Sequence, residues 1–219
     1  MGTLESVHIF KQSMQTQSEL NTELDAAAQL DVKLKQVINS YGYPEPRPRE
    51  HGFKTMLRII VSQQISTKVA AVIWARVEQV CEQNVSPQTI LSLNEDALKS
   101  CGLSWQKVGY TKALAERIDS GALKPQALIN MPTQEVLTTL TQIKGYGIWS
   151  AEIYAMFALG KADIYPAGDL ALQVAVQRLE NLTDKPSEKQ TREIAKRWSP
   201  HQSAVALLMW HYYGATTLS

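Results

Sequence analysis

Residues 138–153 of the chain read TTLTQIKGYGIWSAEI. Apolar residues at helical spacing lead up to Gly145, and a second helical pattern begins directly after Gly147. Glycine lets the backbone turn without a Cβ clash and lets it approach another surface closely. The second helix would begin with exposed N–H groups, which suit a phosphate oxygen. This stretch therefore predicts two helices joined by a tight Gly-x-Gly turn.

The same turn has two other interpretations. A dinucleotide-binding fingerprint fails because Ser150 stands at its third glycine position and because a helix, not a strand, precedes it. A plain pair of helices with a glycine cap and no ligand is the commoner fate of an isolated Gly-x-Gly. The rest of the chain has to distinguish that interpretation from a binding turn.

Helical periodicity dominates the rest of the 219 residues, and 44% hydrophobic with 20% charged residues is typical of a globular protein. Helices are predicted over about 18–40, 53–61 and 66–81. Three prolines in 42–48 predict an extended crossover between the first two. Further helix starts follow Ser86, Asn94, Ser104 and Thr133, with capping boxes at Ser187 and Ser199. About ten helices and no strand predict an all-α protein, which excludes a parallel-sheet enzyme.

The charge and the cysteine content of the chain exclude several classes of protein. The net charge is +1, with ten basic and seven acidic residues in 53–144, so any contact with a polyanion would be local. Cys81 and Cys101 are the only cysteines, which excludes a disulfide framework and any four-cysteine metal site. Buried free thiols in a cytoplasmic protein are expected. No apolar run is long enough for a membrane span.

Residues 143–151 resemble the helix–hairpin–helix element of the DNA glycosylase superfamily. In that family a catalytic Asp lies about twenty residues past the hairpin, and Asp169 stands 22 residues after Gly147. The resemblance extends to 60–66, 102–110 and 198–210, and so covers about residues 50–213. It is strongest to the 3-methyladenine DNA glycosylase II branch. One departure is Tyr146, where the family usually has an aliphatic residue.

The resemblance implies a two-lobed helical fold with the active site in the cleft between the lobes. One lobe would comprise 54–160, and the other would combine 1–53 with 161–219. It further implies a monofunctional glycosylase that removes alkylated, 3-methyladenine-like bases from double-stranded DNA. Such an enzyme needs no cofactor, and we expect a monomer.

Asp169 is the residue expected to stabilise the oxocarbenium-like sugar and to activate water. Its alternative role is to cap the helix that follows, and the two roles can coexist. Bifunctional relatives place a lysine at the position of Trp149 to form a Schiff base, so the resemblance implies water as the nucleophile here.

Aromatic and polar residues complete the expected site. An electron-rich ring binds a cationic alkylated purine, so Trp149, Trp210 and, more weakly, Tyr154 are expected pocket walls, with core packing as the alternative. The resemblance places residues 62–64 at the gap left by a flipped base, with Gln64 preferred over Gln63. It also places DNA phosphate and a monovalent cation at the hairpin. The phosphate contacts would be Lys144, Gly145, Gly147 and Ser150, and the cation would lie at the backbone of Thr141 and Ile143.

Three alternatives remain open at this point. The first is a glycosylase for another lesion class, such as oxidised or deaminated bases. The second is a non-catalytic hairpin protein that binds DNA without specificity. The third is a helical scaffold with no role on DNA, against which Trp149, Gly147 and Asp169 together argue.

Overall fold

The computed structural model describes residues 16–217, which form helices and no strand. The predicted all-α class is confirmed, and no helix in this part of the chain is long and apolar enough to cross a membrane. The elements are α1 Gln17–Leu30, α2 Val32–Tyr41, α3 Phe53–Ser62, α4 Thr67–Val80, α5 Pro87–Ser92, α6 Glu95–Ser100, α7 Trp105–Asp119, η1 Pro125–Leu128, α8 Thr133–Thr141, α9 Ile148–Phe157, α10 Leu170–Glu180, α11 Glu188–Ala195, η2 Lys196–Trp198 and α12 Gln202–Thr217.

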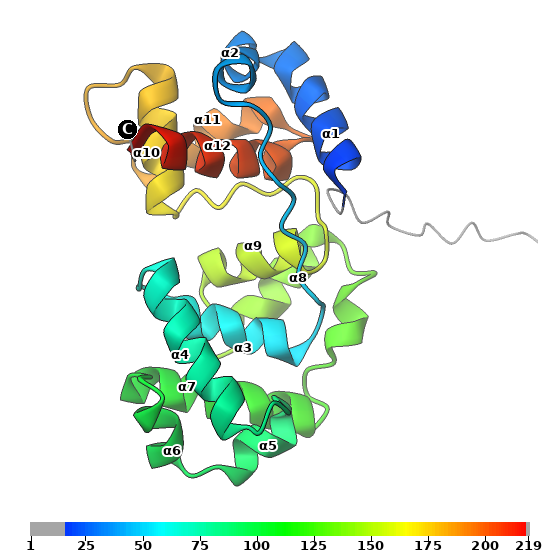
Figure 1. The fold of residues 1–219 in the computed structure, drawn as a ribbon. Coiled ribbons are helices and arrows are strands. Elements are labelled where there is room, and N and C mark those ends of the chain that lie inside the picture. The colour runs from blue at the N-terminus through cyan, green and yellow to red at the C-terminus, as the bar shows by residue number, and fades with distance from the viewer. Residues whose placement is uncertain (1–15, 218–219) are drawn as a thin grey trace, which may run out of the picture.

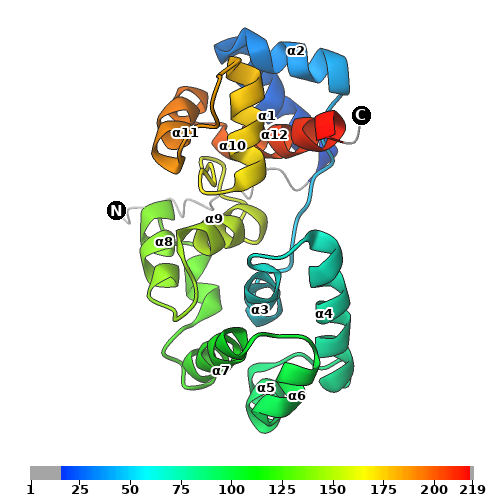
Figure 2. The ribbon, with the colours of Figure 1, turned by 90° about the vertical axis from the view of Figure 1, so that its left-hand side faces the viewer.

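The helices form two groups, one above the other in Figure 1. In the lower group α3 packs against α4, α7 and α9, while α8 packs against α9. In the upper group α12 packs against α1, α2 and α10, as the turned view in Figure 2 also shows. The chain crosses between the groups through residues 42–52 and 158–169, neither of which is helical. The division into 54–160 and 1–53 with 161–219 stays a proposal, and its first 15 residues lie outside the described residues.

The single helix predicted over about 18–40 is wrong, because the chain breaks at Asp31. Asp31 is extended (φ −145°), and its carboxylate accepts the N–H of Lys33 to cap α2. The same carboxylate accepts the indole N–H of Trp198 at 2.9 Å and pairs with Arg197 at 2.9 Å. A side chain that bonds its own backbone competes with the helix, and the two distant partners favour the break.

Side chains cap most of the other helices where the sequence predicts it. The confirmed caps are Ser86, Asn94, Ser104 and Ser187. Helix α8 begins one residue earlier than predicted, because Thr133 is its first residue and Pro132 is its N-cap, with no side-chain cap. The capping box predicted at Ser199 is wrong, because Ser199 and Gln202 both donate to the carboxylate of Asp163 instead of bonding each other.

Helix α9 lies at the centre of the molecule. All its residues from Ser150 to Phe157 are buried, as expected for a helix that is apolar on all sides. It packs against α3 and α8, and its last residue, Phe157, stacks on Trp210 of α12 with 5.7 Å between the ring centres. The hairpin helix therefore touches both groups and exposes only its N-terminal end, where Ile148 is 42% accessible. Cys81 and Cys101 are buried free thiols, as predicted.

Candidate active site

Asp169 stands at the N-terminus of α10, and four N–H groups point at its carboxylate. Oδ1 accepts the backbone N–H groups of Ala171 at 3.0 Å and Leu172 at 3.2 Å, so the side chain caps the helix. Oδ1 also accepts the indole N–H of Trp210 at 3.1 Å, and Oδ2 accepts that of Trp149 at 3.1 Å. These donors come from three helices, and together they fix the orientation of one half-buried carboxylate.

A pocket of about 1190 Å³ opens beside this carboxylate. Its walls are the elbow between α3 and α4 (62–66), the N-terminal turn of α7, the hairpin from Thr141 to Ser150, and residues 168–170. The pocket therefore brings together the predicted elbow, hairpin and catalytic Asp, which are distant in the sequence. The polar and apolar groups around one carboxylate are what a cleft for a nucleic-acid base requires.

The two hairpin glycines differ in backbone conformation and in the space around them. Gly145 has φ +83°, and a Cβ placed on it would lie 2.1 Å from ring atoms of Tyr110, so only glycine fits both the backbone and the packing. Gly147 has φ −72°, which any residue adopts, and a Cβ on it would meet nothing within 4 Å. The expectation that both glycines relieve the turn therefore holds for Gly145 alone. At Gly147 the missing side chain leaves open space at the pocket wall.

The hairpin presents the start of α9 at the pocket. Gly147 is the N-cap and has no side chain to bond the first turn, so the first N–H groups of the helix lack a side-chain acceptor. Lys144 is exposed and lines the pocket beside them. A helix N-terminus with free N–H groups next to a cation is suited to bind a phosphate.

The elbow is fastened to the hairpin by Gln63. Its side-chain amide donates to the carbonyl of Gly145 at 2.8 Å and to Oγ of Ser150 at 2.9 Å. Ser150 is buried, so Gln63 and Ser150 brace the two walls of the pocket against each other. This contact could not be predicted from the sequence, since the two residues are 87 positions apart.

Gln64 is exposed at the tip of the elbow. It has φ +57°, a left-handed conformation that costs a non-glycine residue on the order of 1 kcal/mol. Lys107, on α7, donates from Nζ to the carbonyls of Val61 and Gln63 at 2.8 and 2.7 Å, and so holds the elbow from below. Burial lowers the pKa of Lys107. Sequence reasoning missed the role of Lys107, because its partners are main-chain carbonyls of a distant segment.

Of the predicted aromatic walls, only Trp149 lines the pocket. Trp210 reaches Asp169 through its N–H but stacks on Phe157 outside the pocket lining. Tyr154 is fully buried, and its hydroxyl accepts the N–H of Gly52 at 3.0 Å and bonds Nδ1 of His51 at 2.7 Å. The placement of Tyr154 does not support a pocket wall, because its side chain packs toward the crossover segment.

The family model of the HhH-GPD superfamily base excision DNA repair proteins matches residues 57–201. DNA-3-methyladenine glycosylase 1 of Schizosaccharomyces pombe is 26% identical over 187 residues, which cover 83% of this chain and 82% of that protein. A putative DNA-3-methyladenine glycosylase of Bacillus subtilis is 29% identical over 165 residues, covering 72% of this chain and 58% of that protein.

Solved structures agree with the sequence relatives. The S. pombe 3-methyladenine DNA glycosylase in complex with abasic DNA superposes with a TM-score of 0.81 at 26% identity, covering 86% of this chain and 95% of that one. A DNA-3-methyladenine glycosidase of Bacillus halodurans gives a TM-score of 0.76 at 29% identity, with 90% and 91% covered. The resemblance inferred from the hairpin and Asp169 is confirmed, and the chain belongs to the HhH-GPD superfamily of base excision DNA repair proteins.

Proposed function

We propose that the chain is a monofunctional DNA glycosylase that hydrolyses the N-glycosidic bond of alkylated, 3-methyladenine-like bases in duplex DNA. The observation that carries the proposal is the carboxylate of Asp169, held by four N–H donors at the edge of a large pocket. The S. pombe and B. subtilis relatives, by their names, support the alkylated-base class. We expect the protein to act as a monomer.

The reaction asks the protein to stabilise positive charge on a sugar. When the bond between C1′ and the base nitrogen breaks, the base takes the electron pair and the sugar becomes oxocarbenium-like. The oxygen of a water molecule then bonds C1′, and the water gives one proton to the carboxylate of Asp169, which passes it to solvent. A carboxylate fixed near C1′ stabilises this charge without having to reorganise, which is typically worth on the order of 10²–10³ in rate.

The two oxygens of Asp169 have different tasks in this proposal. Oδ1 accepts three N–H groups, whereas Oδ2 accepts only that of Trp149. The two oxygens of a carboxylate have about four acceptor sites in total; Oδ1 is crowded by its three donors, whereas Oδ2 has room for a water molecule. We assign Oδ1 to holding the side chain, and Oδ2 to facing the sugar and orienting the water.

Trp149 serves both the carboxylate and the base in this account. Its N–H is committed to Asp169, while its side chain lines the pocket that a flipped base would enter. The face of an indole attracts a cation by about 0.5–2 kcal/mol, which favours an N-alkylated purine over a neutral one. With tryptophan at the position of the family's Schiff-base lysine, the proposed enzyme releases the base without cutting the strand.

DNA would bind across the hairpin and the elbow. The N–H groups of Gly145 and Gly147, with Lys144, would bind phosphate, and exposed Gln64 would fill the gap left by the flipped base. Gln63 and Ser150, predicted as DNA contacts, are bonded to each other, so we propose that they support the interface from inside.

A monovalent cation is compatible with the hairpin backbone. Thr141 and Ile143 lie at the pocket, and the carbonyl of Ile143 accepts one N–H, from Tyr146 at 2.9 Å, which leaves it a second acceptor site. Neutral carbonyl oxygens suit a singly charged ion. Such an ion would offset the charge of the phosphate bound beside it.

Release of free base from DNA tests the proposed function. The purified protein is incubated with duplex DNA that carries methylated purines, with uracil-containing DNA and with 8-oxoguanine-containing DNA, and free bases are separated by chromatography. We expect 3-methyladenine to be released and the other two substrates to be left intact. Release of uracil or 8-oxoguanine alone would reassign the lesion class. Binding to DNA without release of any base would make the protein a non-catalytic hairpin protein.

A further inference from the structure

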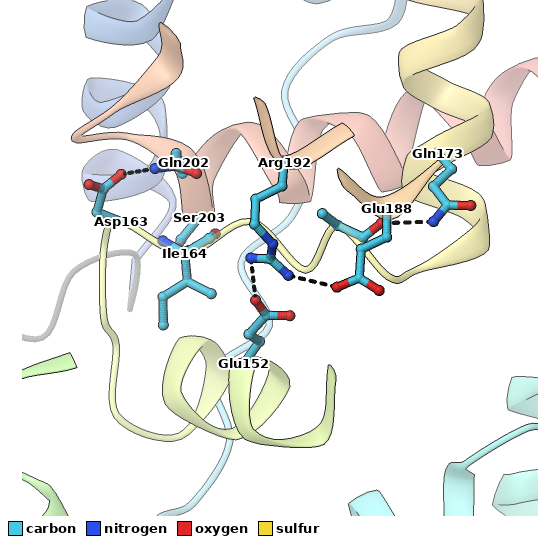
Figure 3. A network of polar contacts seen from close by, with 9 residues as sticks. Glu152, Asp163, Ile164, Gln173, Glu188, Arg192, Gln202 and Ser203 are labelled. Carbon is cyan, nitrogen blue, oxygen red and sulfur yellow. Dashed lines mark hydrogen bonds and ion pairs between the residues drawn. The ribbon is translucent and has the colours of Figure 1, made fainter. Parts of the chain in front are cut away.

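The buried carboxylate of Glu152 is the least expected group on α9. It is 1% exposed and is the one charged residue of α9. Its Oε1 accepts Nη1 of Arg192 at 2.7 Å, and Nη2 of Arg192 donates to Oε1 of Glu188 at 3.0 Å (Figure 3). Arg192 and Glu188 belong to α11, in the other group of helices. We call these three residues the Arg192 bridge.

Core packing alone does not account for the bridge. Burial raises the pKa of Glu152, and Arg192 opposes that effect. A buried ion pair is often no more stabilising than apolar residues of the same size, because both charges lose their water. Stability alone is therefore a weak reason for a charge at this buried position of the central helix.

The bridge ends on the backbone next to Asp169. Oε2 of Glu188 lies 3.3 Å from where a Cβ on Gly168 would stand, so the Glu188 side chain packs against the residue directly before Asp169. At its other end Glu152 follows Trp149 by three positions on α9, and residues at that spacing share a helix face. Trp149 in turn donates to Asp169. Asp169 is thus linked to Trp149 on α9, and Glu152 on the same helix is linked through Arg192 and Glu188 to Gly168.

The backbone N–H of Lys161 donates to the carbonyl of Ala155 on α9 at 3.1 Å, while two further contacts hold the same segment without reaching α9. The hydroxyl of Ser203 accepts the N–H of Ile164 at 3.1 Å, and the amide of Gln173 donates to the carbonyl of Ala167 at 2.9 Å (Figure 3). In each of these two bonds, one partner lies in the segment 158–169 and the other lies on a helix of the upper group. Arg192 is thus a side-chain tie between α9 and α11, in addition to the direct bond from Trp149 to Asp169, that reaches the backbone beside Asp169.

We propose that Arg192 is a positioning residue, which sets the carboxylate of Asp169 relative to Trp149 and the pocket by bridging Glu152 and Glu188. This rests on the proposed function, in which that carboxylate faces the sugar. Displacement of a reacting group by about 1 Å can cost on the order of 10²-fold in rate. Arg192 has no contact with the pocket and would not touch DNA bases.

The test compares Arg192→Met with the double variant Glu152→Gln/Arg192→Met, which removes the buried charge together with its partner. Lys196→Met is the matched control, since Lys196 pairs with Glu193 on the surface nearby. Three quantities are measured on each full-length protein: the single-turnover rate of 3-methyladenine release with excess enzyme, the Kd for DNA, and the thermal midpoint. The indole N–H resonances of the five tryptophans report on the bonds to Asp169, with Trp149→Phe and Trp210→Phe used to assign them.

We expect Arg192→Met to slow release by about tenfold to 10²-fold, with the Kd for DNA within about twofold of the wild type. The Trp149 and Trp210 resonances should shift. The double variant should regain thermal stability but remain slow, and Lys196→Met should match the wild type in every measurement. The proposal is overturned if Arg192→Met releases base at the wild-type rate with unshifted resonances. Recovery of both stability and rate in the double variant would overturn it as well, because the bridge would then serve folding alone.

Asp169→Asn is assayed alongside to separate the two claims. If that variant is slow while Arg192→Met is as fast as the wild type, only the positioning role fails. If Asp169→Asn releases base at the wild-type rate, the proposed function of the carboxylate fails, and the role of Arg192 fails with it.

Discussion

Trp149 and Asp169 are 20 residues apart in the chain and are joined by a hydrogen bond of 3.1 Å from the indole Nε1 to Oδ2. In the proposed function, the residue that stands where the resemblance places the lysine of bifunctional relatives therefore holds the carboxylate and does not attack the sugar. A fixed indole N–H also fixes the ring, so the orientation of the pocket wall and of the carboxylate depend on the same bond.

No covalent adduct should form when borohydride is added during turnover. A Schiff base needs an amine at C1′, and Trp149 supplies none. The measurement is a denaturing gel of labelled DNA after reduction, with an 8-oxoguanine glycosylase/lyase on its own substrate as the positive control. A reduced protein–DNA band that grows in step with base release would contradict the monofunctional assignment.

Gly147→Val should fold normally and bind DNA less tightly. Its backbone conformation suits any residue and the space around it is open, but a branched side chain would keep a phosphate from the first turn of α9. The loss should be the same on any DNA sequence, because backbone contacts carry no base information. A binding titration and a thermal melt measure the two effects.

Gly145→Val is the contrasting variant, since its side chain would collide with Tyr110 and its φ is positive. It should lower the thermal midpoint, unlike Gly147→Val. Unchanged DNA affinity in folded Gly147→Val would remove the hairpin from the interface.

DNA affinity should fall with salt only moderately. Lys107 and Lys144 are the basic residues at the pocket, and Lys107 is engaged by two carbonyls. Contacts to three to five phosphates would give a slope of log affinity against log salt of about −3 to −5. A titration series from 50 to about 300 mM salt measures it. A slope near −10, as for a strongly basic repressor, would show that the local-contact view is wrong.

Stability should fall on acidification because of His51. Burial lowers the pKa of His51 below its ordinary value of 6.5, while the carbonyl of Pro125 has a smaller opposite effect. The unfolded chain therefore binds a proton more readily than the folded one. The resulting stability is fully present above pH 6.5 and is lost as the pH falls from 6.5 to the lower, folded pKa.

Urea unfolding at pH 7.5 and about pH 5.5 measures this effect, which one proton limits to about 1.4 kcal/mol per pH unit. His51→Gln keeps a polar partner for Tyr154 and should show a shallower pH dependence. Equal pH dependence in the two proteins would show that His51 is not the responsible group.

Features of the fold that depend on neighbouring residues were predicted better than features that depend on residues far away in the sequence. The cap at Ser104 could be predicted because it depends on residues within three positions. The break at Asp31 could not, since one of its partners, Trp198, is 167 residues away. The wrong box at Ser199 has the same cause, because its hydroxyl finds Asp163 across the fold.

The candidate site was likewise predicted only in the parts that do not depend on how distant helices pack. Asp169 and the hairpin were predicted together from a family resemblance, but the bond from Trp210 and the Arg192 bridge depend on how the helices pack. The aromatic residues of α9 were hard to divide between pocket and core. A helix that is apolar on all sides has no polar face to show which side is exposed, so the sequence alone does not show that the side chain of Tyr154 is buried.

The central claim is that the charge of Asp169 drives catalysis, and Asp169→Asn tests it. Asparagine keeps the size and the capping oxygen but offers no second acceptor to Trp149, so folding should survive with a loss of about 1–2 kcal/mol. DNA affinity should hold or rise slightly, because a negative charge no longer repels phosphate. The thermal melt and the binding titration are the controls.

The decisive measurement is single-turnover release of 3-methyladenine by folded, DNA-bound Asp169→Asn. We predict a rate lower than the wild type by on the order of 10²–10³, the usual effect of removing a preorganised electrostatic group. Release at the wild-type rate would mean that Asp169 is only the cap of α10, and it would contradict the catalytic role assigned to it.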